Sequence, residues 1–170
     1  MASGSVVGSI LQSIAPAASR ATPGVRAGGS TPGENWPILS FDDTTDEYWD
    51  FLCALQGYDA GGLTVEIPWM AATATTGAVA WNVAIRRLAD DAEDLDVSHT
   101  YDFNVITPTT ASAAGELSYD TVTFTSGADM DSLADGERFM LRVFRDPDHG
   151  SDNLSGDAQI LWPSIIIRET

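Results

Sequence analysis

Two stretches of alternating residues constrain the fold of this chain most strongly. The first spans residues 63–69 and the second spans residues 79–85. A period of two is typical of a β-strand with one face against a core and the other turned away from it. Pro68 falls on the second face and lacks an N–H group, which predicts a bulge or a strand edge at that point. The residues predicted to face inward are Leu63, Val65, Ile67, Trp69, Val79, Trp81, Val83 and Ile85.

Shorter apolar runs, separated by residues typical of turns, bring the predicted number of strands to eight. They span residues 36–41, 48–53, 101–107, 117–125, 139–145 and 158–167. No helical stripe of about ten residues occurs after position 36, which disfavours βαβ folds and parallel sheets. Eight antiparallel strands in a domain of this length are typical of a jelly roll. The sequence therefore predicts an all-β, eight-stranded antiparallel jelly-roll sandwich.

The first part of the chain has a different composition. Residues 1–33 are rich in Ala, Ser, Gly, Pro and Thr, contain no aromatic residue and carry a charge of +2, whereas residues 34–170 hold 6 basic and 25 acidic residues, a net charge of −19. We predict a flexible N-terminal arm over residues 1–33 and the jelly-roll domain over residues 34–170. The arm is either an amphipathic segment that binds a partner or a disordered tail, because five of its apolar residues have helical spacing: Val6, Val7, Ile10, Leu11 and Ile14.

The net charge of −17 excludes some partners. A surface of that sign repels phosphate backbones, so we expect no binding to nucleic acid. All 8 basic residues are Arg, which fits either a saline environment or a GC-rich genome. No apolar run approaches the ~20 residues that span a bilayer, and the first twenty residues lack the basic start of a signal peptide. We therefore expect neither membrane association nor secretion by a signal peptide.

The sequence contains no local signature of catalysis. Cys53 is the single cysteine, so neither an intrachain disulfide nor a cysteine-based zinc site can form, and its apolar strand favours a buried, inert thiol. A Gly-x-Ser-x-Gly elbow, a His-Glu-x-x-His helix and a phosphate-binding glycine loop are all absent. We expect no catalytic residues, no cofactor and no enzymatic activity.

Two acidic clusters are candidate calcium sites. The residues around position 93 do not match the register of an EF-hand loop, so a solvated acidic loop is the better interpretation. The loop of residues 146–157 has a weaker calcium signal, and Asx turns explain it equally. We expect calcium to be dispensable, with this second loop as its site if it binds. Nothing in the sequence places His99 near His149. The clusters are Asp90, Asp91, Glu93, Asp94 and Asp96, and Asp146, Asp148, Asp152 and Asp157.

The five tryptophans fall into two predicted groups. Trp69 and Trp81 share the inward register of their strands and are predicted to be core residues. Trp36, Trp49 and Trp162 are candidates for a subunit interface, where aromatic residues are enriched. A sugar-binding platform would instead require exposed rings.

The order of several short motifs over residues 36–169 resembles the jelly-roll structural proteins found in the virions of tailed viruses. The motifs that carry this resemblance are Phe41-Asp42-Asp43-Thr44-Thr45, Gly61-Gly62-Leu63-Thr64-Val65 leading to Trp69, Thr76-Gly77-Ala78-Val79-Ala80-Trp81, Leu141-Arg142-Val143-Phe144-Arg145-Asp146, the stretch from Asp152 to Asp157, and Ile165-Ile166-Ile167-Arg168-Glu169.

The resemblance implies a non-enzymatic component of a virus particle, with no catalytic residues to carry over. Such domains act as capsid decoration or cement proteins, or as parts of fibres and spikes, and often form homotrimers. We accordingly expect the arm to fasten the protein to the major capsid protein on the capsid surface of a virion. The alternative is a receptor- or carbohydrate-binding jelly-roll module of a tail fibre or spike.

Overall fold

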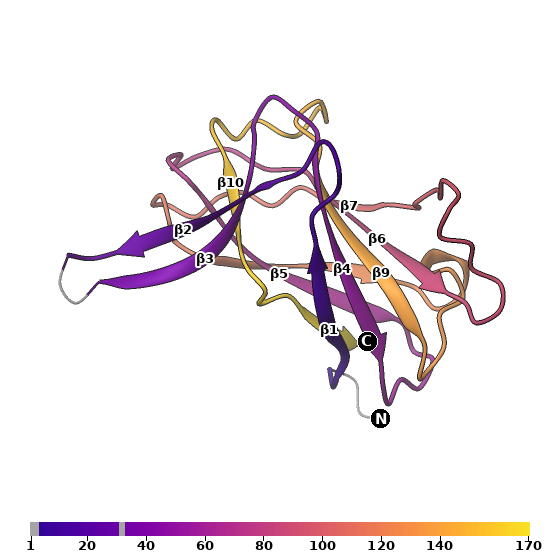
Figure 1. Cartoon of the computed structure of the whole chain (residues 1–170). Coiled ribbons are helices and arrows are strands. Elements are labelled where there is room, and N and C mark those ends of the chain that lie inside the picture. Colours follow the sequence, from indigo (N-terminus) through magenta and orange to yellow (C-terminus); the bar gives the residue numbers. More distant parts are fainter. Residues whose placement is uncertain (1–3, 31–32) are drawn as a thin grey trace.

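The computed structural model describes residues 4–30 and 33–170, and antiparallel strands form nearly all of its regular structure (Figure 1). The chain also contains a short 3-10 helix, η1 (Ala128–Met130). The predicted all-β antiparallel sandwich is confirmed, with eleven strands among the described residues in place of eight. The described part of the chain has no helix that could cross a membrane. The strands are β1 (Val6–Ile14), β2 (Thr22–Gly28), β3 (Glu34–Phe41), β4 (Glu47–Leu55), β5 (Leu63–Ala71), β6 (Trp81–Leu88), β7 (Asn104–Ile106), β8 (Ser118–Phe124), β9 (Arg138–Arg145), β10 (Ala158–Leu161) and β11 (Ile166–Glu169).

The strands form two layers that enclose the core. One layer runs β2-β3-β10-β5 and continues to β8 on the far side of β5, and the other runs β1-β4-β9-β6-β7. β11 pairs with both β5 and β1, so it joins the layers along one side. Trp81 of β6 meets Phe41 of β3 and Trp69 of β5 edge to face, with ring centroids 5.1 and 6.1 Å apart. These aromatic contacts cross from one layer to the other and close the core.

The predicted inward register is confirmed, because all eight residues named for it belong to the hydrophobic core cluster, whereas the residues between them do not. Pro68 lies where β5 changes partner along one edge: β11 pairs with β5 up to Glu66, and β10 begins to pair at Trp69. The missing N–H group of Pro68 therefore falls at a junction between two partner strands, which agrees with the predicted irregularity.

The predicted flexible arm requires a correction, because residues 6–14 and 22–28 are strands of the sandwich. β1 lies between β11 and β4 and pairs with both, and β2 pairs with β3 along its whole length. Val7 and Ala21 are buried, with exposed fractions of 3% and 0%. A segment without aromatic residues cannot form a core alone, but it can complete a sheet whose other strands supply the apolar surface. Residues 1–3 and 31–32 of the predicted arm lie outside the described residues.

Candidate ligand-binding groove

A groove of about 310 Å³ lies on the outer face of the layer that contains β2, β3, β10, β5 and β8. Met70 and Leu161 contribute apolar surface to it. Trp36 of β3 and Tyr119 of β8 also line it, and they are 47% and 62% exposed. The full lining consists of Arg26, Ala27, Gly28, Trp36, Met70, Gly115, Leu117, Tyr119 and Leu161.

The strand order sets the width of the groove. The hairpin of β2 and β3 extends away from the rest of the sandwich (Figure 1), and within it Trp36 of β3 is the register partner of Arg26 of β2. Two strands, β10 and β5, separate β3 from β8. Three interstrand spacings amount to about 14 Å between the β3 and β8 backbones. Trp36 and Tyr119 therefore lie on the same face of the layer but on two strands that are separated by β10 and β5.

Arg26 is held in place by groups from two other parts of the fold. Its Nη1 donates hydrogen bonds to Gln159 Oε1 at 2.7 Å and to the carbonyl oxygen of Ala72 at 3.3 Å. A Cβ atom at position 115 would lie 2.8 Å from Cζ of Arg26, so the guanidinium group packs against a backbone that only glycine can provide there. Gly115 also has a φ of 79°, a left-handed conformation that favours glycine.

Beyond Tyr119, the outer face of β8 is rich in hydroxyl groups. Thr121 and Thr123 follow Tyr119 at a spacing of two and are exposed, opposite Glu66 and Thr64 of β5. The alternate residues of β8 include buried ones that face the core. A strand over residues 117–125 was predicted from the sequence, but its outward row of hydroxyl groups was not. The alternation of Tyr119, Thr121 and Thr123 was the signal that could have identified it.

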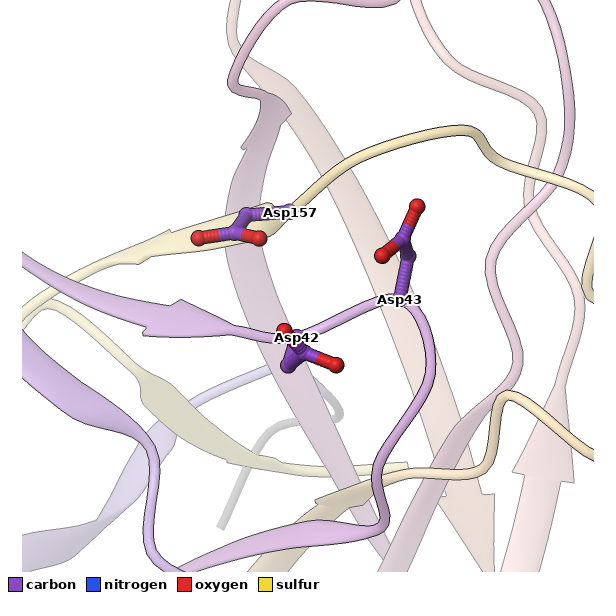
Figure 2. A group of neighbouring side chains, drawn as sticks. All are labelled: Asp42, Asp43 and Asp157. Carbon is purple, nitrogen blue, oxygen red and sulfur yellow. The ribbon is translucent and has the colours of Figure 1, made fainter.

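The structure gathers three carboxylates, two from the loop after β3 and one from the residue before β10 (Figure 2). Oxygens of Asp42, Asp43 and Asp157 lie within 4.8 Å of one another. Each side chain accepts hydrogen bonds from the chain itself: Asp42 from Thr44, Asp43 from the Gly156 N–H group, and Asp157 from the Ser40 hydroxyl group. The bonds from Thr44 lower the pKa of Asp42. These contacts tie the two segments together, and the dispensability of calcium stays a prediction.

The four aspartates predicted as a cluster in residues 146–157 interact with different groups in the structure. Asp157 joins the group just described, whereas Asp152 forms an ion pair with the fully buried Arg145 at 3.0 Å. Partial burial, followed by the charges of Asp146 and Asp148, raises the pKa of Asp46 above its usual value. The loop therefore does not assemble its four aspartates into one site.

The acidic loop around Glu93 lies beside a polar cavity of about 270 Å³. Glu93 forms an ion pair with Arg86, and Nε2 of His99 lies 3.3 Å from the same carboxylate. Asp94 accepts a hydrogen bond from the backbone N–H group of Asp96. The charges of Arg86 and Glu93 at this cavity therefore neutralise each other.

Aromatic rings also cover part of the outer face of the other layer. Arg142 of β9 forms two hydrogen bonds with Asp50, at 2.7 and 2.8 Å, and its guanidinium carbon lies 4.0 Å from the ring centroid of Tyr101. The loop that contains Tyr101 therefore packs over this face. Tyr48 and Phe144 stack beside it with centroids 4.4 Å apart. Here the aromatic rings find partners within the chain.

The three tryptophans predicted as interface candidates have different environments in the structure. Trp49, a predicted interface residue, is instead 4% exposed, and its indole N–H group donates to the Ser13 hydroxyl oxygen. Trp162 donates to the same oxygen at 2.9 Å. Among the described residues, Trp36 is the most exposed tryptophan, with an exposed fraction of 47%. Cys53 is buried as predicted, and burial raises the pKa of its thiol to about 12.

No family model matches this sequence, and no curated protein matches it. Solved structures with a similar fold include the CBM22-1 xylan-binding domain from Paenibacillus barcinonensis, at 10% identity and a TM-score of 0.44, with 96% of each chain covered. A family 11 carbohydrate-binding module from Clostridium thermocellum, solved with a beta-1,3-1,4-mixed-linked tetrasaccharide, gives 14% identity, a TM-score of 0.45 and 96% coverage of each chain. The enzymatically active domain of bacteriophage CBA120 tailspike protein 4 gives 10% identity and a TM-score of 0.40, over 96% of this chain and 19% of that one. Likeness at this distance does not identify a ligand or a role.

Proposed function

We propose that this protein is a non-catalytic carbohydrate-binding module, which holds a glycan in the groove between Trp36 and Tyr119. The observation that carries the proposal is the pair of exposed aromatic side chains on the two sides of a groove with apolar lining. A concave surface of apolar and aromatic residues with a few polar groups is the usual form of a ligand site.

A glycan matches this surface chemically. A pyranose ring has apolar C–H faces that pack on aromatic rings, and its edge carries hydroxyl groups that donate and accept hydrogen bonds. The groove supplies the rings through Trp36 and Tyr119 and a cationic donor through Arg26. Thr121 and Thr123 extend the same face with hydroxyl groups. A chain of several sugar residues could therefore contact the groove and the threonine row together.

Attachment to a capsid was predicted through a flexible N-terminal arm. Because β1 and β2 are strands of the sandwich, residues 6–14 and 22–28 are not free to act as such an arm. A glycan-binding groove agrees better with the alternative role, a receptor- or carbohydrate-binding module of a tail fibre or spike. The viral origin, the homotrimer, the contact with a major capsid protein and the virion location are untested proposals.

Affinity electrophoresis of the full chain against a panel of soluble polysaccharides tests this function. The panel should contain neutral glucans, xylans, mannans and acidic polymers. We expect retardation by at least one polymer, and loss of that retardation in Trp36→Ala and Tyr119→Ala. Val25→Ala is the matched control, since Val25 is 65% exposed on β2 but does not line the groove. Migration unaffected by every polymer would refute the proposal.

A further inference from the structure

We propose that the groove selects glycans that carry carboxylate groups, such as chains of uronic acids, and that Arg26 determines this selectivity. This inference rests on the proposed carbohydrate-binding function and specifies its ligand class. The observations that support it are the charge of the Arg26 side chain, its contacts and the residues around it.

Arg26 has no carboxylate partner within ion-pair distance among residues 4–30 and 33–170, although the chain holds 25 acidic residues. Four other arginines do have such partners, in the pairs Arg86–Glu93, Arg87–Glu137, Arg142–Asp50 and Arg145–Asp152. The lining of the groove contains no Asp or Glu at all. In a strongly acidic protein, the groove is thus a local positive site.

The contacts that fix Arg26 leave its charge uncompensated. Gln159 and the Ala72 carbonyl group are neutral acceptors, and both bind Nη1. A guanidinium group has five N–H donors, and its Nε and Nη2 atoms have no hydrogen-bond acceptor among the described residues. Gly115 lies against the Nε and Nη2 side of the group, where a Cβ atom would be 2.8 Å from Nε, so backbone without a side chain is all that covers this side. The guanidinium is therefore positioned in advance while retaining donors for a ligand.

A carboxylate is the ligand group that best matches these donors. The planar fork of an arginine binds a carboxylate through two parallel hydrogen bonds, which are stronger than bonds to a neutral hydroxyl group. A uronic acid presents that carboxylate on the same pyranose ring whose apolar face can pack on Trp36 or Tyr119. The net charge of −17 opposes a polyanion at long range, but salt screens this repulsion beyond about 10 Å at 0.1 M and leaves a direct contact less affected.

The test compares two polymers with the same backbone, of which one has a carboxylate where the other has a neutral hydroxymethyl group. Polygalacturonate and its carboxyl-reduced product have the same linkage, and the second lacks the carboxylates. Binding of the full chain to each should be measured by calorimetry at about 0.15 M salt, with alginate and carboxyl-reduced alginate as a second pair. We expect at least tenfold tighter binding to one acidic polymer than to its reduced form, and loss of this preference in Arg26→Gln.

Arg138→Gln is the matched control, since Arg138 is an exposed arginine of β9 that does not line the groove. It removes the same unit of charge and should keep the preference. Equal or tighter binding of the reduced polymers by the parent protein would overturn the inference and leave the carbohydrate-binding function intact. Loss of preference in both arginine variants would assign the effect to net charge and also overturn it. Failure to bind any polysaccharide would overturn both proposals.

Discussion

Gly8 of β1 lies against Ile167 of β11 with no room for a side chain between them. A Cβ atom at position 8 would be 2.5 Å from Cβ of Ile167 and 2.8 Å from its Cδ1. The contact lies where β11, already paired with β5, also pairs with β1. A glycine in the supposed arm therefore permits the two layers of the sandwich to be joined.

Substitution of Gly8 tests this close approach. Gly8→Val should lower the free energy of unfolding by about 1–3 kcal/mol, because inserted methyl groups force packed neighbours to move. Chemical denaturation followed by tryptophan fluorescence measures the change. Ser9→Ala, at an exposed neighbouring position of the same strand, should stay within about 0.5 kcal/mol of the parent. Equal stability of Gly8→Val and the parent would show that β1 is not packed in this way.

Removal of β1 should have a larger effect. Deletion of residues 1–14 uncovers the edges of β4 and β11 and removes the Ser13 hydroxyl group that accepts from the indoles of Trp49 and Trp162. We expect a marked fall in the melting temperature measured by circular dichroism, or an insoluble product. A flexible arm predicts the opposite, an unchanged melting temperature.

Arg145 organises the loop before β10 from inside the fold. It is 0% exposed, forms an ion pair with Asp152, and donates to the carbonyl oxygens of Phe41, Leu154 and Gly156. Arg145→Met leaves the partner carboxylate and these carbonyls without their donor, so we expect a loss of about 3–5 kcal/mol of stability. Denaturant titration measures this loss. A cost below about 0.5 kcal/mol, the range of an ordinary surface substitution, would contradict the assignment.

Strands with one buried face were predictable from their sequence, and β1 was not. Leu63, Val65 and Ile67 alternate with other residues because burial of one face imposes a period of two. In β1, Gly8 and Ser13 serve through close approach and hydrogen bonding, and the apolar residues have a helical spacing in place of a period of two. Composition alone therefore suggested a flexible segment where the structure has an inner strand.

The groove could not be predicted because its walls are distant in sequence. Trp36 and Tyr119 meet the same groove only through the strand order that places β3 and β8 on either side of β10 and β5. The same applies to Asp157 and Asp42, which lie close together although most of the chain separates them in sequence. Local patterns indicate which face of a strand is buried, whereas the pairing of distant strands decides which outer residues become neighbours.

Cys53 should be chemically inert in the folded protein. Because burial raises the pKa of its thiol to about 12, only about one thiol in ten thousand is ionised at pH 8, and the thiolate is the reactive form. Mass spectrometry should detect no alkylation by iodoacetamide under native conditions and complete alkylation in denaturant. Rapid modification of the native protein would show that the strand carrying Cys53 opens readily.

A glycan in the groove would lie beside Trp36, and the five tryptophan indole groups provide internal reporters of where it binds. Trp69 and Trp81 are fully buried, Trp49 and Trp162 donate to Ser13, and Trp36 lines the groove. The direct measurement is a nitrogen-15 NMR titration with an oligosaccharide of the polymer that binds in affinity electrophoresis. We predict that the indole signal of Trp36 and the backbone signals of β3 and β8 move together with the ligand, while the indole signals of Trp69 and Trp81 stay in place. Saturable binding that leaves the Trp36 signal unmoved would show that the glycan occupies another surface and would refute the proposed groove.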